Sequence, residues 1–268
     1  MGTTARQLPS ALECFDRLMM LAAGRRFALF LDYDGTLTPI VDRPELAVLT
    51  ESTRGVLREL ARRIPVAVIS GRDLNDIRRL VGIEGIHYAG SHGFEIQGPD
   101  GQPLDAELAA AHLSALDRAE EELRRRLEGV PGVLLERKRY TLAVHYRLVE
   151  PGRYREIETA VAAVAAASPE LRRTEGKKVF ELRPALDWDK GKALKRLAAV
   201  LGLRRTSDFP IFIGDDRTDE DAFREMRDWG VGILVRDADV PTWAQFALDS
   251  PGEVTEFLHR LRASLEAS

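Results

Sequence analysis

Asp32 and Asp34 stand one residue apart at the end of an apolar run, residues 27–31, and Gly35 follows them. An uninterrupted apolar run is typical of a strand buried in a parallel sheet, and open α/β sheets place ligand sites at the carboxyl ends of such strands. Two carboxylates there repel each other unless a cation lies between them, and Mg²⁺ prefers oxygen ligands. A carboxylate beside this ion stays ionised and can attack phosphorus as a nucleophile. The alternative is a strand that ends in a solvent-exposed acidic turn.

A second apolar run, residues 209–213, also ends in a glycine with acids close behind it. These acids are Asp215, Asp216 and Asp219. Taken alone, they could form an acidic helix N-terminus; a calcium-binding loop is a weaker alternative, because the glycine required at its sixth position is absent. Together with the first run they predict a metal site, with Asp32 and Asp215 as ligands and the main-chain carbonyl of Asp34 as a third. Asp216 and Asp219 are expected in its outer shell or as partners that orient a lysine.

Two shorter patterns fit an anion site beside this metal. Residues 64–69 predict a third strand that ends in Ser70 and Gly71, whose hydroxyl and amide could hold phosphate oxygens. Such a pair is by itself more often a simple turn. Lys190 opens a predicted helix over 190–201, where free amide groups favour an anion and a lysine adds charge. A lysine exposed to solvent is equally compatible with that position.

These four segments follow one another along the chain with Asp32 first, then Ser70, Lys190 and Asp215. In that order they resemble the motifs of phosphatases of the haloacid dehalogenase superfamily. The amino-acid sequences of residues 31–37, 70–72, 90–93 and 214–221 are similar to those of the trehalose-6-phosphate phosphatase family. The resemblance covers residues 25–260, nearly the whole chain. It implies a Mg²⁺-dependent enzyme in which Asp32 forms an aspartyl-phosphate and Asp34 acts first as general acid and then as general base. Phosphate binding by Ser70, Gly71 and Lys190 is part of the same implication.

The chain is expected to form a doubly wound parallel-sheet core with a smaller α+β domain inserted in it. Strands and helices alternate up to residue 98, turn residues follow, and the α/β pattern resumes at residue 190. We therefore expect a core made of residues 1–103 and 186–268 and a cap made of residues 104–185. Helices are predicted at 10–21, 50–63, 73–80, 104–127 and 155–167, and cap strands at 133–138, 141–148 and 177–183.

The predicted cap strands alternate between apolar and charged side chains. Leu142, Val144, Phe180 and Leu182 fall on one face, which needs the two cap helices as cover. The opposite face holds charges of both signs, and an ordinary solvated face would look the same. The resemblance favours sugar binding there, with His92 on the core rim and Arg72 after the third strand. The residues that it implies for the substrate are Arg72, His92, Glu136, Lys138, His145, Arg147, Lys177 and Glu181.

Composition limits the partners. The net charge of −4 across 268 residues provides no basic footprint for nucleic acid. Cys14 is the only cysteine, so an internal disulfide is impossible and an oxidising compartment is not implied. We see no signal peptide and no apolar run long enough for a bilayer. We therefore expect a cytoplasmic enzyme without a membrane or nucleic-acid partner. The resemblance suggests trehalose 6-phosphate as its substrate and trehalose-6-phosphate synthase as the enzyme that it works alongside.

Three other functions remain open from the sequence. Phosphatases for sucrose phosphate or for mannosyl- or glucosyl-phosphoglycerate share much of this framework. A phosphomutase would need a sugar bisphosphate as primer. A catalytically silent sugar-phosphate sensor should lack one of the four key residues, and this chain retains all of them: Asp32, Asp34, Lys190 and Asp215.

Overall fold

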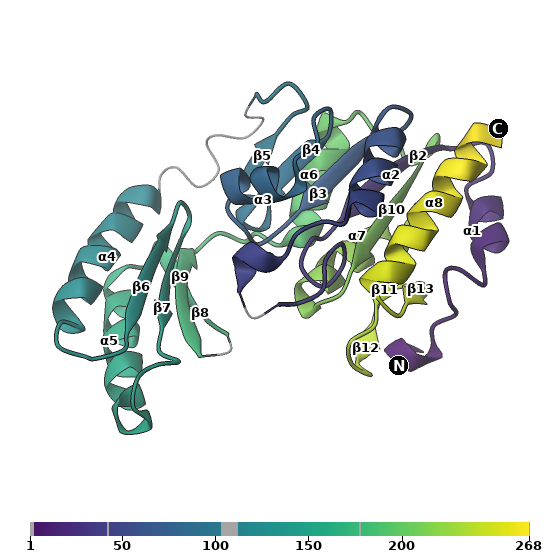
Figure 1. Cartoon of the computed structure of the whole chain (residues 1–268). Helices are drawn as coiled ribbons and strands as arrows, with labels where there is room; N and C mark the ends of the chain where they lie inside the picture. The colour runs from purple at the N-terminus through teal and green to yellow at the C-terminus, as the bar shows by residue number, and fades with distance from the viewer. Residues whose placement is uncertain (1–2, 42, 103–111, 177, 268) are drawn as a thin grey trace. The chain divides into compact units, whose positions relative to one another are not determined.

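The computed structural model describes residues 3–41, 43–102, 112–176 and 178–267. The chain forms two compact units, one made of residues 1–104 and 188–268 and the other of residues 105–187 (Figure 1). The expected cap limits, 104 and 185, stay a prediction, and the first of them lies outside the described residues.

A seven-stranded sheet forms the first unit, in the order β13-β11-β10-β2-β3-β4-β5. Every neighbouring pair is parallel except β4 and β5. Because β10, β2 and β3 are adjacent and parallel, their carboxyl ends lie at one edge of the sheet. The strands are β2 Arg26–Leu31, β3 Val66–Ile69, β4 His87–Gly90, β5 Glu95–Gln97, β10 Asp208–Gly214, β11 Val231–Val235 and β13 Phe246–Leu248.

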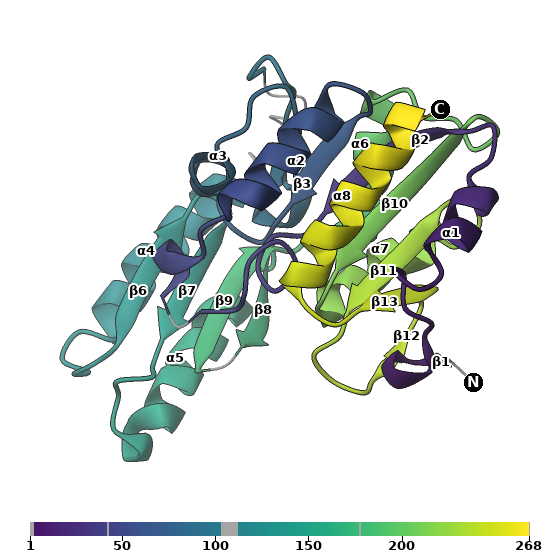
Figure 2. The ribbon, with the colours of Figure 1, turned by 45° about the vertical axis from the view of Figure 1, so that its right-hand side comes forward.

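Helices cover both faces of this sheet, as predicted for a doubly wound fold (Figures 1 and 2). In β2, Leu29 and Leu31 join the core on one face, whereas Ala28 and Phe30 join the core on the other. Full burial of one such large apolar side chain contributes about 1.5–3 kcal/mol to stability. The first face is covered by α1 Phe15–Leu21, α2 Glu51–Ala61, α3 Leu74–Val81 and α8 Pro251–Ala267, and the second by α6 Lys190–Val200 and α7 Glu220–Met226.

Side-chain caps set where two of these helices begin. Thr50 accepts a hydrogen bond from the amide of Thr53 at the start of α2. Asp189 accepts a 2.8 Å hydrogen bond from the amide of Lys192, so α6 begins at Lys190. An N-cap of this type stabilises a helix by about 1 kcal/mol. The cap on α6 therefore holds Lys190 at the edge where β2 and β10 end.

The second unit is an α+β layer pair. Its antiparallel sheet has the order β6-β7-β9-β8, and α4 and α5 pack on its apolar face. Leu142, Val144, Phe180 and Leu182 are buried on this face, as predicted. The elements are α4 Leu113–Arg126, β6 Leu134–Lys138, β7 Thr141–His145, α5 Tyr154–Ala167, β8 Leu171–Gly176 and β9 Val179–Pro184.

Several predicted boundaries were wrong. The strand expected over 141–148 ends at His145, because the chain turns where the Val149 amide bonds the Tyr146 carbonyl. Leu148, the last residue of the expected strand, is 84% exposed in this turn. The helix expected from residue 10 begins only at Phe15. Strand β8 was missed, because its mostly polar sequence resembles a loop.

The remaining strands are short. β1 Thr3–Thr4 pairs antiparallel with β12 Pro241–Thr242.

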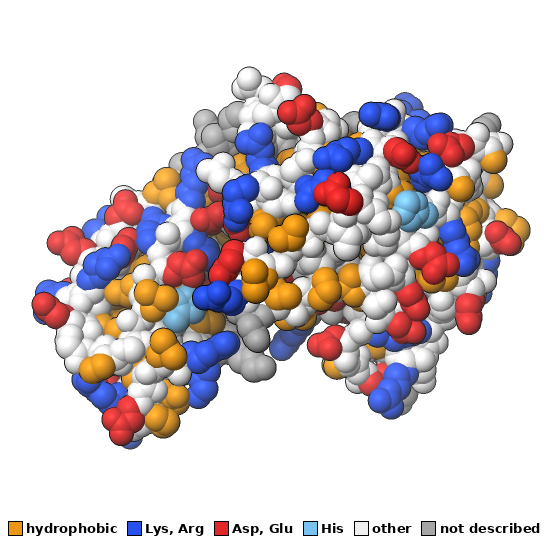
Figure 3. All heavy atoms as spheres, viewed as in Figure 1, with side chains coloured by type: hydrophobic (Ala, Val, Ile, Leu, Met, Phe, Trp, Pro, Cys, Tyr) orange, Lys and Arg blue, Asp and Glu red, His pale blue; other side chains and the backbone are white. Residues whose placement is uncertain are grey.

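No helix in the described part of the chain is long and apolar enough to cross a membrane. On the face shown in Figure 3, the coloured basic and acidic side chains are interspersed.

Candidate active site

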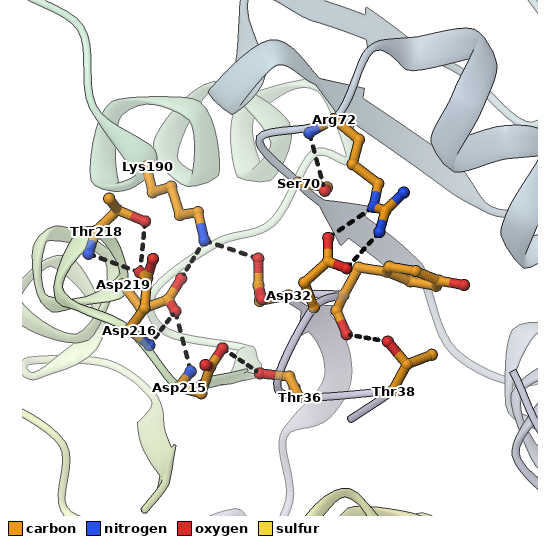
Figure 4. Close-up of polar contacts among 12 residues, drawn as sticks. Asp32, Thr36, Thr38, Ser70, Arg72, Lys190, Asp215, Asp216, Thr218 and Asp219 are labelled. Atoms are coloured by element: carbon orange, nitrogen blue, oxygen red, sulfur yellow. Dashed lines mark hydrogen bonds and ion pairs between the residues drawn. The ribbon is translucent and has the colours of Figure 1, made fainter. Parts of the chain in front are cut away.

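Three carboxylates meet at the edge where β2 and β10 end (Figure 4). Asp32, Asp215 and Asp219 each bring one oxygen to a common place, and these oxygens lie within 4.8 Å of one another. Asp32 follows β2, and the other two follow β10. The parallel pairing of the two strands therefore unites residues that are far apart in the sequence.

Asp219 uses both of its oxygens inside the protein. Oδ1 accepts a 2.6 Å hydrogen bond from Lys190 Nζ. Oδ2 accepts 3.0 Å hydrogen bonds from the amides of Asp215 and Asp216. Asp219 is fully buried at the end of the short 3-10 turn Arg217–Asp219. It therefore fixes both the lysine and the loop that carries Asp215.

Lys190 is the cation of this cluster. Its Nζ lies 2.7 Å from Asp32 Oδ1, and its side chain is 3% exposed. Burial alone would lower the pKa of Lys190, but the charges of Asp219 and Asp32 outweigh burial and raise it. The amine therefore stays protonated. Burial raises the pKa of Asp32 above its ordinary value, and the charge of Lys190 opposes this shift.

Asp215 lies in an acidic surrounding that suits a divalent cation. Burial, with the charges of Asp219 and Asp216, raises the pKa of Asp215 to about 7. Thr36 Oγ1 donates a 3.2 Å hydrogen bond to it. Carboxylates that repel one another in this way would be stabilised by a bound hard cation. The donor set is made of oxygen atoms, which fits such an ion.

Gly35 leaves the room that this carboxylate needs. Its φ of +87° is a conformation that favours glycine. A Cβ atom at this position would lie 2.0 Å from Asp215 Oδ2. A side chain at residue 35 would therefore displace Asp215. The glycine after the two aspartates thus has a steric role that its position in the sequence did not reveal.

Asp34 pairs with Arg72. Arg72 Nε donates to Asp34 Oδ2 over 2.7 Å, and Nη2 donates to Oδ1 over 2.5 Å. A third nitrogen, Nη1, lies 3.1 Å from Asp76 Oδ2. Sequence reasoning assigned Arg72 to the substrate and missed this pair. Asp34 follows β2 and Arg72 follows β3, and they meet because these two strands are neighbours in the sheet. The periodicity of the sequence does not predict such a pair.

Ser70, Gly71 and His92 come together beside these residues. Ser70 is buried, and its hydroxyl accepts a 3.1 Å hydrogen bond from the Arg72 amide. The His92 ring lies so close to Gly71 that a Cβ there would be 2.8 Å from its Cε1. The His92 amide bonds the Ser70 carbonyl. The structure thus unites the predicted phosphate-binding segment with His92.

The remaining predicted substrate residues belong to the second unit. Glu136 Oε2 lies 2.8 Å from His145 Nε2, and Glu136 Oε1 lies 3.9 Å from Lys138 Nζ. Glu181 pairs with Arg183. Arg147 lies in the turn after β7, and not on the strand as predicted. Lys177 is outside the described residues.

Two residues of the site escaped the sequence reasoning. Thr36 was read only as part of a motif, although its hydroxyl binds Asp215. Tyr33 is fully buried, donates a 2.5 Å hydrogen bond to the Ala47 carbonyl, and lies under Arg72 with 5.4 Å between the ring centroid and Cζ. The signal in the sequence was the position of this tyrosine between two aspartates, because a large aromatic ring beside two acids needs a packing partner of its own.

Comparison with known proteins identifies the family. Residues 30–252 match the family model described as trehalose-phosphatase. The chain belongs to the trehalose-phosphatase family. Its relatives include the trehalose-phosphate phosphatase of Mycobacterium marinum, which is 46% identical over 263 residues, covering 97% of this chain and 67% of the relative.

Solved structures place this family member in the expected fold. The C-terminal domain of the trehalose-6-phosphate phosphatase of C. albicans has a TM-score of 0.75 and 25% identity, covering 96% of this chain and 98% of that one. A haloacid dehalogenase-like hydrolase from Bacteroides thetaiotaomicron has a TM-score of 0.64 and 15% identity, covering 88% and 99%. The second likeness concerns the fold alone. The predicted family and the predicted α/β fold are therefore confirmed.

Proposed function

We propose that this trehalose-phosphatase family member hydrolyses trehalose 6-phosphate to trehalose and inorganic phosphate. The observation that carries the proposal is the cluster of the buried residues Asp32, Lys190 and Asp219 with the half-buried Asp215 at the carboxyl edge of the sheet. Such a cluster joins a nucleophile, a fixed cation and oxygen ligands. The relatives named above are trehalose-phosphate phosphatases, which supports the choice of substrate.

In the first step, an oxygen of Asp32 attacks phosphorus and forms an aspartyl-phosphate. The bond between phosphorus and the sugar oxygen breaks, its electron pair goes to that oxygen, and Asp34 supplies the proton. In the second step, water attacks the phosphorus of the intermediate. Asp34 takes a proton from the water, phosphate leaves, and the Asp32 carboxylate is restored.

Charge stabilisation of the transferring group is the larger part of this catalysis. We assign contacts with the phosphate oxygens to Lys190, Ser70 and the Gly71 amide. Mg²⁺ held by Asp32, Asp215 and the Asp34 carbonyl would neutralise charge on the phosphate. Asp216 and Asp219 act around these groups. Asp216 accepts hydrogen bonds from the amide and hydroxyl of Thr218, and Asp219 orients Lys190.

We further propose that residues 104–185 act as a cap that reads the sugar. A disaccharide offers many hydroxyl groups, each both donor and acceptor, so a surface with acids and bases suits it. The charged side of the second unit's sheet has this character. The residues that we assign to sugar binding are Glu136, Lys138, His145, Arg147, Lys177 and Glu181, together with His92 of the first unit.

The test is a phosphate-release screen with trehalose 6-phosphate, glucose 6-phosphate, sucrose phosphate and the two glycosyl-phosphoglycerates. We expect the highest kcat/KM for trehalose 6-phosphate, and release without any bisphosphate primer. Preference for another ester would replace the substrate. Absence of release from every ester, with binding of trehalose 6-phosphate retained, would point to a silent sensor. Release only with a bisphosphate would point to a phosphomutase.

We also propose that the enzyme acts in the cytoplasm, where trehalose-6-phosphate synthase would supply its substrate. The single cysteine, Cys14, is compatible with a reducing compartment. Comparing trehalose 6-phosphate levels in cells with and without the gene tests this proposal, because loss of the phosphatase should cause the ester to accumulate.

A further inference from the structure

Arg72 holds the carboxylate of Asp34 through two parallel hydrogen bonds. We propose that Arg72 is a positioning residue, which fixes Asp34 for the step in which the leaving oxygen takes a proton. This inference rests on the proposed function, because only there does Asp34 meet a departing oxygen. It differs from the substrate-binding role expected from the sequence, since the guanidinium bonds protein carboxylates with three nitrogens.

The arginine is the fixed partner of this pair. Its side chain is 11% exposed, whereas that of Asp34 is 41% exposed. The ring of Tyr33 lies beneath the guanidinium, Asp76 binds its far side, and the Ser70 hydroxyl accepts from its main-chain amide. Three separate contacts therefore hold Arg72, and Arg72 in turn holds the more exposed carboxylate of Asp34.

The geometry gives this contact a specific consequence. A partly exposed aspartate at a strand end can occupy several side-chain rotamers. A planar guanidinium that binds both oxygens selects one orientation, which the point charge of a lysine would not do. Misplacement of a catalytic group by about 1 Å can cost about 100-fold in rate. Loss of Arg72 should therefore slow the step that needs Asp34 more than steps that do not.

Helix α3 anchors this arrangement. Arg72 precedes the helix, and Asp76 lies in its first turn. Asp76 also accepts a 2.6 Å hydrogen bond from Arg79, whose side chain is 65% exposed. Arg79 thus shares Asp76 with Arg72, and its ion pair in the described part of the chain is with Asp76 and not with Asp34, which makes it a matched control for charge near this site.

Two aryl esters of nearly equal size separate positioning from binding. Phenolate is a strong base, with a phenol pKa of about 10, so its departure from phenyl phosphate benefits from a proton. p-Nitrophenolate is a much weaker base and departs without one. The ratio of kcat/KM for the two esters, measured in saturating Mg²⁺, reports on this proton, because kcat/KM ends at release of the leaving group.

We expect Arg72→Ala to lose at least about 10-fold more activity on phenyl phosphate than on p-nitrophenyl phosphate, which is a part of the 10²–10⁴-fold that general acid catalysis contributes. Arg72→Lys should lie between the wild type and Arg72→Ala. Arg79→Ala should leave the ratio unchanged. Asp76→Asn weakens the contact of Asp76 with Arg72 Nη1 and leaves the two hydrogen bonds to Asp34 in place. It should shift the ratio in the same direction as Arg72→Ala, but by a smaller factor.

Equal losses of Arg72→Ala on both esters would overturn the inference and indicate a structural or phosphate-binding role. An unchanged ratio combined with a raised KM for trehalose 6-phosphate would also overturn it, in favour of sugar binding. If circular dichroism shows that Arg72→Ala does not fold, Arg72→Lys and Asp76→Asn test the inference instead. An unchanged ratio of kcat/KM for the two esters in both variants would contradict it. A wild type that cleaves aryl esters but not trehalose 6-phosphate would defeat the proposed substrate alone.

Discussion

Lys190 donates a 2.7 Å hydrogen bond to Asp32, although the two residues lie 158 positions apart in the chain. Both side chains are almost completely buried. Removing one partner of a buried ion pair typically costs about 3–5 kcal/mol, because the other charge is left uncompensated. Here Asp219 binds the same amine, so the lysine keeps one carboxylate when Asp32 is changed. This arrangement allows the proposed nucleophile to be tested without unfolding the protein.

Asp32→Asn should abolish phosphate release while the fold is retained, because an amide cannot attack phosphorus as a carboxylate does. Activity and the far-UV spectrum of the purified variant check this together. Asp221→Asn is the control, since Asp221 lies in the first turn of α7, where its side chain accepts a hydrogen bond from Arg224. More than about a hundredth of the wild-type turnover in Asp32→Asn would contradict the nucleophile, because acid–base groups alone contribute about 10²–10⁴-fold.

Removal of divalent ions should stop the reaction. The carboxylates of Asp32, Asp215 and Asp219 crowd together, and the single positive charge of Lys190 pairs with two of them, Asp32 and Asp219. Treatment with EDTA followed by dialysis should abolish phosphate release, and added Mg²⁺ should restore it. Full activity in buffer shown to be metal-free by elemental analysis would rule out the site as drawn.

Gly35→Ala should lose both Mg²⁺ binding and activity. The new methyl group would meet Asp215 Oδ2 at 2.0 Å, and the φ of +87° is unfavourable for alanine. Gly55→Ala is the matched control, because Gly55 lies within α2 and a Cβ there meets no atom within 4 Å. Calorimetric titration with Mg²⁺ compares the two. Equal Mg²⁺ affinities in both variants would remove Gly35 from the site.

Glu136→Ala and Glu181→Ala should lower kcat/KM for trehalose 6-phosphate by roughly 10- to 150-fold each, because a lost hydrogen bond to a charged group costs about 1.5–3 kcal/mol. p-Nitrophenyl phosphate has no sugar for these residues to bind and should be affected much less. Glu156→Ala, at the surface of α5 beside Arg153, should change neither. Equal losses on both substrates would mean that the two acids support the fold or the chemistry and do not recognise sugar.

Asp208 should make stability depend on pH. Burial would raise the pKa of Asp208, but hydrogen bonds from the Arg204 amide and Ser207, with the charge of Arg26, outweigh burial and lower it. A lowered folded-state pKa contributes stability above the unfolded value of about 3.8, and this stability is lost as the pH falls further. Asp208→Asn should therefore cost about 1.5–3 kcal/mol at pH 7.

Urea unfolding at pH 7 and pH 3 measures this effect. The difference between the wild type and Asp208→Asn should shrink at the lower pH, where the wild-type carboxylate begins to take up a proton. Asp228→Asn, at an exposed position, is the control. A difference of the same size at both pH values would show that shape, and not charge, explains the loss.

Local patterns were enough to predict the strands of this protein that end in acidic residues. The apolar runs before Asp32 and before Asp215 predicted two buried strands with acids at their ends, and β2 and β10 are such strands. Parallel strands in open sheets share one functional edge, so two such runs already implied that their acids meet. The alternation of Leu142, Val144, Phe180 and Leu182 likewise predicted the covered face of the second sheet, because strand side chains alternate regardless of context.

Only the tertiary structure decided which polar groups pair with one another. Asp219 was expected either in the outer shell of the metal or as a partner that orients Lys190, and its two oxygens bind Lys190 and the main chain of residues 215 and 216. Arg72 was expected on the substrate, yet it binds Asp34 and Asp76. Strand order, loop conformation and side-chain rotamers together determine such pairs. A linear pattern records burial and periodicity, whereas hydrogen bonds between distant residues depend on distances that arise only when the sheet assembles.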